Sequence, residues 1–205
     1  THIKLLGVTI DNCLSFRKHT NFVSQSCNYH IRALRHIRHT LDIHTASLIA
    51  HALISYRIDY ANSLLYGSPQ YNFTKLQRIQ NSLARIVLQS NRQAHSDTLL
   101  HQLHWLPVHS RVYFKLATIT YKALSTSSPQ YLASLLRRHQ PVRSLRSNDQ
   151  LLLDIPFSRT NFGSRSFRCA APSVLNSLPL QLRSSPTLST FKSALKTYLF
   201  SHPPA

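Results

Sequence analysis

The sequence predicts a mainly α-helical protein: a helical bundle with an N-terminal β-strand or hairpin and a less regular, basic C-terminal part that ends in a helix. Three observations support this. Apolar residues recur every three to four positions in several long segments, the period of an amphipathic helix. The clearest β-branched, apolar run is at residues 3–10. Between residues 140 and 165 the composition shifts to Pro, Ser, Arg and Asn.

The N-terminal elements follow from their periods and turn residues. Residues 3–10, IKLLGVTI, form the expected strand, and the pair Asp11-Asn12 is a turn signal that ends it. The helical period starts near residue 15 and continues to about residue 41. A second helix is expected at about 44–56. Asp42 would be its N-cap, because a carboxylate there can accept hydrogen bonds from the first backbone amides.

The remaining helices are predicted in the same way. A third helix follows the turn Gly67-Ser68-Pro69, and a short helix at about 99–106 should end at Pro107, which disfavours helix before it. Trp105, in this short segment, is expected to pack in the core. The last three predicted helices span about 109–124, 131–138 and 189–200.

The charge balance is strongly basic. The chain has 205 residues, with 24 Lys and Arg against six acids, all Asp, so the net charge is 24 − 6 = +18. Such an excess predicts nucleic acid as the partner, with an anionic membrane surface as the alternative.

No apolar run reaches the ~18 residues of a membrane span, and no signal peptide is visible. We therefore expect a soluble, intracellular protein, in the cytoplasm or the nucleus. Three Cys without a CxxC pair do not suggest a disulfide framework. Because the chain has no Met, we expect it to be an internal fragment.

Several strings recur in a characteristic order along almost the whole chain. Together they resemble the C-terminal part of a non-LTR (LINE-type) retrotransposon reverse transcriptase, of the CR1, L2 and Jockey-like groups. The strings are KLLGVTID at 4–11, ISYRIDYANSLLYG at 54–67, LQRIQNSLARIV at 76–87, LHWLPVHSRVYFKL at 103–116, FGSRSFRCAAP at 162–172 and FKSALKTYLF at 191–200. The chain departs from the family pattern at Ala61, where Cys is frequent, and at Leu175, where Trp is frequent.

The resemblance implies three regions. Residues 1–12 would be a residual palm strand on the primer-grip side, 13–138 a helical thumb-like bundle, and 139–205 a basic linker and C-terminal subdomain. It also implies that this region holds template–primer duplex, RNA or an RNA/DNA hybrid, and that the palm and fingers of the parent enzyme are further partners. The family's catalytic motifs lie upstream of the matched strings. Mg²⁺ would serve the intact polymerase, and no cofactor is expected in this fragment.

The acidic residues do not form a polymerase site. Two-metal catalysis needs clustered carboxylates, and the six Asp here are scattered singly. We therefore expect no enzymatic activity from the chain as it stands, with Asp11 as a turn residue, Asp42 as a cap and Asp59 at a helix end or in an ion pair. Two His-x-x-His pairs, at 36–39 and 101–104, lack further ligands nearby and are interpreted as surface residues.

The basic residues are the candidate functional residues. Six on predicted helices are expected to contact nucleic-acid phosphates: Arg32, Arg35, Arg38, Lys75, Arg78 and Arg85. An ordinary solvated helix face is the alternative, although such faces usually mix both signs of charge.

A second basic region interleaves arginines with Phe157, Phe162 and Phe167, which could stack on unpaired bases; a disordered linker is the other interpretation. Its arginines are Arg137, Arg138, Arg143, Arg146, Arg159, Arg165 and Arg168, of which Arg143, Arg146 and Arg165 are the predicted nucleic-acid contacts.

Two other functions remain open at this point. The chain could be a free-standing, non-catalytic basic module that binds nucleic acid or a protein. It could also be a decayed transposon remnant without a function.

Overall fold

The computed structural model describes residues 2–140 and 151–204. The protein is mainly helical with a small N-terminal hairpin, as predicted. It forms two compact units, Thr1–Val112 and Tyr113–Ala205. The region boundary expected at residue 138 lies inside the second unit.

The N-terminal apolar run forms two strands instead of one. β1 (His2–Leu5) pairs antiparallel with β2 (Val8–Asp11), so that Ile3 lies opposite Ile10. The two residues between the strands, Leu6 and Gly7, have φ angles of 46° and 80°. Positive φ at both positions is typical of the tight turns that match the twist of a hairpin, and glycine adopts it without strain.

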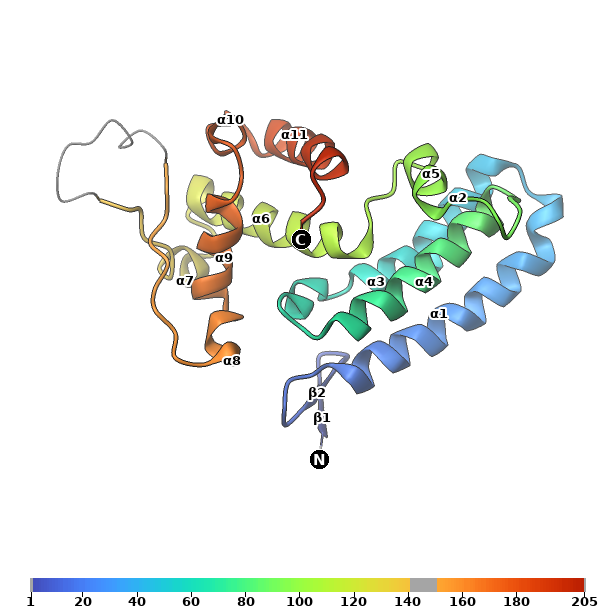
Figure 1. Ribbon diagram of the computed structural model, residues 1–205, viewed down its shortest axis with the longest axis horizontal. Helices are drawn as coiled ribbons and strands as arrows, with labels where there is room; N and C mark the ends of the chain where they lie inside the picture. The colour runs from blue at the N-terminus through green and yellow to red at the C-terminus, as the bar shows by residue number, and fades with distance from the viewer. Residues whose placement is uncertain (1, 141–150, 205) are drawn as a thin grey trace. The chain divides into compact units, whose positions relative to one another are not determined.

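Helices form the rest of the first unit (Figure 1). They are α1 (Arg17–Ile37), a 3-10 turn (Arg38–Thr40), α2 (Ile43–Ala50), a π-helical turn (His51–Ser55), α3 (Tyr56–Asp59), a 3-10 turn (Asn62–Leu65), α4 (Gln70–Val87) and α5 (Ser96–Gln102). α6 (Val108–Thr126) begins in this unit and continues into the second.

α1 and α4 lie side by side and run parallel, as Figure 1 shows. Near their N-termini the Thr20 hydroxyl donates to the Asn72 side-chain oxygen at 2.8 Å, and near their C-termini Arg38 donates to the Val87 carbonyl. The segment from α2 to α3 packs against both. The shared core includes Cys27, Leu34, Ile54, Leu76, Leu83, Val87 and Val112, all buried.

The second unit is built from the rest of α6 and several shorter helices. These are α7 (Gln130–Ala133), α8 (Asn161–Ser164), α9 (Phe167–Asn176), α10 (Leu180–Arg183) and α11 (Leu188–Ser201). Tyr121 of α6 stacks on Phe191 of α11, with ring centroids 4.3 Å apart. α7 is shorter than the helix predicted at 131–138, and α9 and α10 were not predicted.

Candidate nucleic-acid interface

Two contacts fix which sides of α1 and α4 meet at the surface. The Arg17 guanidinium carbon lies 5.3 Å from the centroid of the Tyr71 ring. The Lys75 ammonium donates to the side-chain oxygen of Asn21. Positions 17 and 21 of α1 therefore lie beside positions 71 and 75 of α4.

Further basic residues follow these positions at helical spacing. On α1, Arg35 lies eighteen positions, or five helical turns, after Arg17, and Arg32 borders the same stripe. On α4, Arg78 follows Lys75 by three positions. All these side chains are exposed. We refer to Arg17, Arg32, Arg35, Lys75 and Arg78 as the basic α1–α4 face. The rise per residue of a helix puts the Arg17 and Arg35 backbones about 27 Å apart, which matches the length of roughly eight base pairs of duplex.

No acidic residue lies on either helix, so nothing on α1 or α4 neutralises this face. The nearest acids along the chain have structural partners. Asp11 accepts hydrogen bonds from the Ser15 amide at 2.9 Å and the Ser15 hydroxyl at 3.0 Å. Asp42 caps α2 by accepting from the His44 and Thr45 amides at 2.9 and 3.1 Å. The predicted turn role of Asp11 and cap role of Asp42 are both confirmed.

The predicted contact residues fall into different environments. Arg32, Arg35, Lys75 and Arg78 are exposed, as expected. Arg38 is not, and its expected exposure is wrong: only 8 % of it is accessible. Its Nε and Nη2 donate to the Val87 carbonyl at 3.0 and 2.6 Å, and its Nη1 donates to the Leu41 carbonyl at 2.6 Å. Arg38 therefore joins the C-terminal ends of α1 and α4.

Arg85 also differs from the prediction. It is partly buried, and its Nη2 donates to the Ala94 carbonyl at 3.3 Å and to the Ser96 hydroxyl at 2.9 Å. This holds the connection between α4 and α5.

Arg165 is partly buried in the second unit. The predictions for Arg143 and Arg146 fall outside the described residues. Arg17 was missed, although its spacing to Arg35 was a usable signal.

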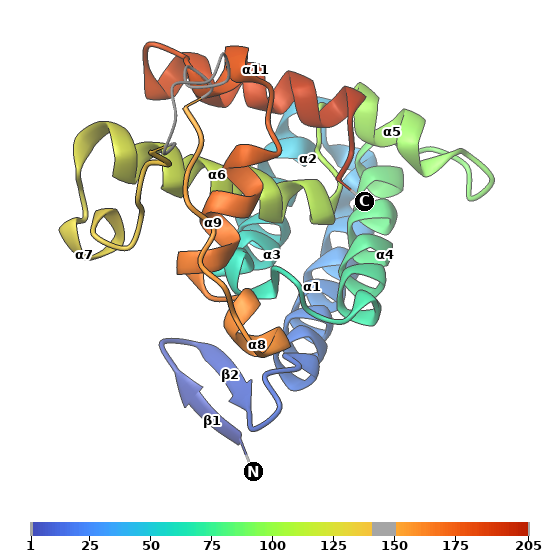
Figure 2. The ribbon, with the colours of Figure 1, turned by 60° about the vertical axis from the view of Figure 1, so that its left-hand side comes forward.

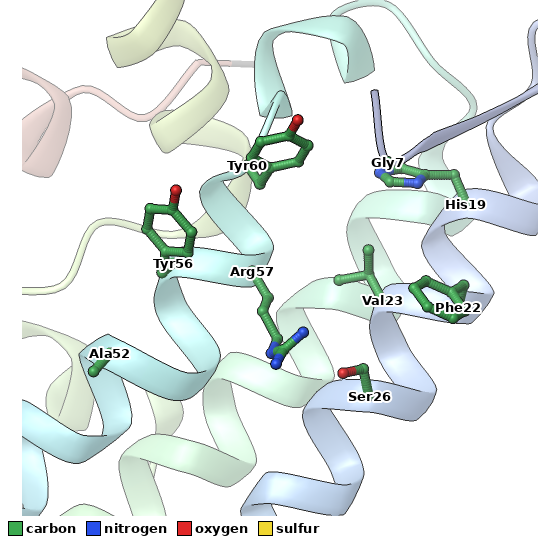
Figure 3. A pocket seen from close by; sticks show the side chains of 9 residues that line it. All are labelled: Gly7, His19, Phe22, Val23, Ser26, Ala52, Tyr56, Arg57 and Tyr60. Atoms are coloured by element: carbon green, nitrogen blue, oxygen red, sulfur yellow. The ribbon is translucent and has the colours of Figure 1, made fainter. Parts of the chain in front are cut away.

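A groove lies on the other side of α1, between α1 and α3 (Figure 3). It has a volume of about 290 Å³ and is lined by Phe22, Tyr56, Tyr60 and Arg57, among others. Arg57 projects toward α1 in Figure 3, and its Nε donates to the Leu53 carbonyl at 3.0 Å. His19 lies at the end near the hairpin, and burial lowers its pKa. Sequence reasoning did not find this groove.

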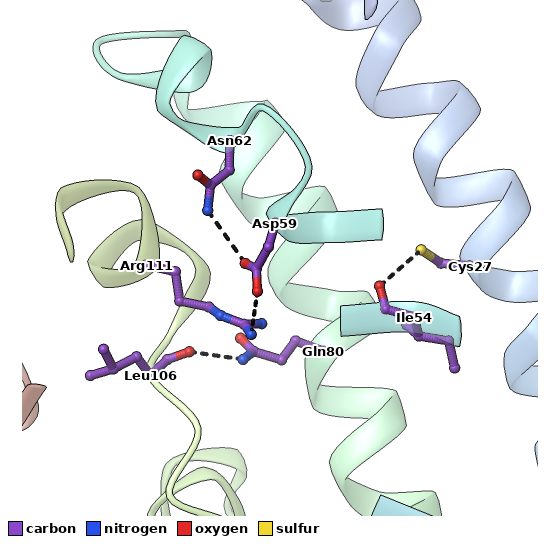
Figure 4. A network of polar contacts seen from close by, with 7 residues as sticks. All are labelled: Cys27, Ile54, Asp59, Asn62, Gln80, Leu106 and Arg111. Atoms are coloured by element: carbon purple, nitrogen blue, oxygen red, sulfur yellow. Dashed lines mark hydrogen bonds and ion pairs between the residues drawn. The ribbon is translucent and has the colours of Figure 1, made fainter. Parts of the chain in front are cut away.

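The segment after α5 is anchored by polar contacts to α3 and α4 (Figure 4). Gln80 of α4 donates to the Leu106 carbonyl at 2.8 Å, and Asp59 pairs with Arg111 at 2.6 Å. Burial lowers the pKa of Arg111, and the charge of Asp59 opposes this effect. Trp105 is buried and contacts the His51 ring edge-to-face. The ion-pair role of Asp59 and the core role of Trp105 are confirmed, so residues 105–111 of the string LHWLPVHSRVYFKL pack against α4 and the segment from α2 to α3.

Within residues 2–140 and 151–204, no group of three or more His, Cys, Asp or Glu side chains could hold a metal ion. The helices in these ranges are too short or too polar to cross a membrane.

Comparison with protein-family models, with curated proteins and with solved structures finds no match to this chain.

Proposed function

We propose that this chain binds duplex nucleic acid, an RNA/DNA hybrid or RNA, through backbone phosphates on the basic α1–α4 face. In doing so it performs the positioning role of the thumb region of a LINE-type reverse transcriptase, holding template–primer duplex for a catalytic palm that other sequence supplies. It does not itself polymerise. The compartment of this activity is intracellular, either the cytoplasm or the nucleus.

One observation carries the proposal: five exposed cations line the seam of two parallel helices that contain no acid. Lys and Arg that neutralise phosphates release counterions, which drives binding without reading sequence. Two helices that share a core hold the backbones that carry these charges at a fixed spacing, which suits a ligand with regularly spaced phosphates. The resemblance points to the same ligand.

The test is binding of a labelled RNA/DNA hybrid of about 20 base pairs, measured by fluorescence anisotropy from about 50 to 300 mM salt. With about five phosphate contacts, log K should fall against log salt with a slope of roughly −4 to −5. R35E and R78E should each weaken binding. Each should also make the slope less negative by about 0.9 or more, which is the contribution of one phosphate contact.

R92E is the matched control, because Arg92 is exposed on the turn between α4 and α5 and lies outside the basic α1–α4 face. It makes the same change in net charge and should have a much smaller effect. Far-UV circular dichroism checks that each variant is folded. Absence of binding by folded protein at low salt would refute the proposal and favour a remnant without a function. Equal losses for R92E and R35E would show diffuse charge attraction instead of a defined face.

A further inference from the structure

The second unit displays two phenylalanine rings to solvent on one short segment. Phe157 is 88 % exposed and Phe162 is 60 % exposed. The core of this unit is formed by other side chains, such as Phe191, Leu195 and Val174, which are almost inaccessible. The two exposed rings are therefore not needed to fill it, and large apolar groups held at the surface often mark a binding site.

The segment that carries these rings is ordered by its own hydrogen bonds. The Ser158 hydroxyl donates to the Thr160 carbonyl at 3.1 Å, and the Thr160 hydroxyl accepts from the Gly163 amide at 3.0 Å, which caps α8. A Cβ on Gly163 would lie 2.2 Å from the Ser158 hydroxyl oxygen, so these two residues touch. Phe157 and Phe162, each next to one of them, are thus presented on a compact loop.

The same loop is fixed to α9. The Cys169 thiol donates to the Pro156 carbonyl at 3.6 Å, so the residue before Phe157 lies against the first turn of this helix. Figure 2 shows the segment passing along α9 before it turns into α8. The backbone of Arg168, which precedes Cys169 in α9, therefore lies close to the Phe157 end of the loop.

Basic residues predominate along the loop. Arg159 lies between the two rings in sequence, and both Arg159 and Arg168 are exposed. Residues 155–205 contain no Asp or Glu. The acid just before them, Asp154, contacts the His139 ring nitrogen at 2.7 Å. We call Phe157, Arg159, Phe162 and Arg168 the aromatic–arginine loop.

We propose that the aromatic–arginine loop binds single-stranded nucleic acid. Unpaired bases stack on Phe157 and Phe162, while Arg159 and Arg168 contact the adjoining phosphates. A phenyl ring has no polar atom with which to select a base, so recognition tolerates any sequence. The bases of a duplex are already stacked on one another, so the loop requires a strand that is unpaired. This site uses a different unit and a different form of ligand from the basic α1–α4 face.

The experiment compares two ligands of equal charge with the full chain. One is labelled oligo(dT) of about 12 nucleotides, and the other is an abasic strand of the same length, which has the phosphates but no bases. At about 0.2 M salt, which weakens purely ionic binding, the wild type should bind oligo(dT) at least about tenfold more tightly. F157L/F162L keeps apolar side chains of similar size but removes the rings, and should abolish this preference.

Two further variants test whether the preference belongs to these two rings. Y131L removes a ring that is 70 % exposed elsewhere in the unit, and should keep the preference for oligo(dT). R35E/R78E should weaken hybrid binding but keep the preference for oligo(dT) over the abasic strand. This proposal and the duplex proposal can therefore fail independently. Equal binding of both strands by the wild type overturns the inference, as does an equal effect of Y131L and F157L/F162L. It is also overturned if F157L/F162L loses binding to phosphatidylserine vesicles while its strand binding is unchanged, because the loop would then contact a membrane surface.

Discussion

Arg35 and Arg38 are three positions apart on the chain and have opposite environments. Arg35 is exposed on the basic α1–α4 face, whereas Arg38 continues the buried stripe of Cys27, Ile31 and Leu34. A buried guanidinium is tolerated only when its donors are satisfied, and those of Arg38 reach the carbonyls of Val87 and Leu41. Its positive charge also lies at the C-terminal end of α4, where the helix dipole favours a cation.

We therefore expect the two arginines to separate stability from binding. R38L leaves the Val87 and Leu41 carbonyls without these donors and should lower the free energy of unfolding by about 1–3 kcal/mol. R35L should change the free energy of unfolding by less than about 0.5 kcal/mol but weaken hybrid binding. Urea denaturation and anisotropy measure the two effects. If R38L were as stable as the wild type, the bonds to Val87 and Leu41 would contribute nothing to the fold.

At the scale of helices, the sequence predicted those elements whose formation depends on a local pattern of residues. α1 and α4 have long, regular apolar periods, and Asp42 at the start of α2 is a local cap. α9 was missed because it is short, lies in a Ser- and Arg-rich stretch and contains Pro172, which lacks the amide for a helical hydrogen bond. The burial of its apolar side chains, among them Cys169, Val174 and Leu175, outweighs that local cost.

The candidate site was only partly predictable for a related reason. Helical spacing shows that Arg17 and Arg35 share one stripe, and that Lys75 and Arg78 lie on one side of their own helix. It does not show which sides of two helices meet. That depends on the bond between Thr20 and Asn72, two residues far apart in the sequence, and on the core that makes α1 and α4 parallel.

The hairpin and α1 meet at a buried histidine. His19 is 7 % exposed, and its Nδ1 lies 3.4 Å from the Thr9 amide of β2. Burial lowers the pKa of His19 from its usual 6.5. The folded protein therefore resists a proton that the unfolded chain takes up, so stability contributed by neutral His19 is present above pH 6.5 and is lost as the pH falls below it.

H19N keeps a polar side chain at this position but cannot titrate. We expect the free energy of unfolding of the wild type to fall more steeply between pH 7.5 and pH 5 than that of H19N. Urea denaturation at a series of pH values measures both curves. Parallel curves for the two proteins would show that the titration of His19 contributes nothing to the pH dependence of the free energy of unfolding.

Over the whole chain, a net charge of +18 opposes folding by self-repulsion. Only six acids are available to offset it. Among the described residues, ion pairs join Arg111 to Asp59 and, if the imidazole is protonated, His139 to Asp154. The exposed cations of the basic α1–α4 face therefore destabilise the protein when it is alone, and a bound polyanion would remove that repulsion. The same charges should couple binding to stability.

Ionic strength tests this coupling. Raising salt from about 10 to 300 mM shortens the screening length and should increase Tm by a few degrees, about 2–5 °C, because repulsion dominates over attraction. R32Q/R35Q/R78Q lowers the net charge from +18 to 18 − 3 = +15, and should have a higher Tm at low salt, a weaker dependence of Tm on salt and weaker hybrid binding. Calorimetry and anisotropy on the same samples measure all three quantities. A wild-type Tm that falls with added salt would mean that ion pairs stabilise the fold. The exposed cations would then not destabilise the free protein, and their repulsion would not favour a polyanionic ligand.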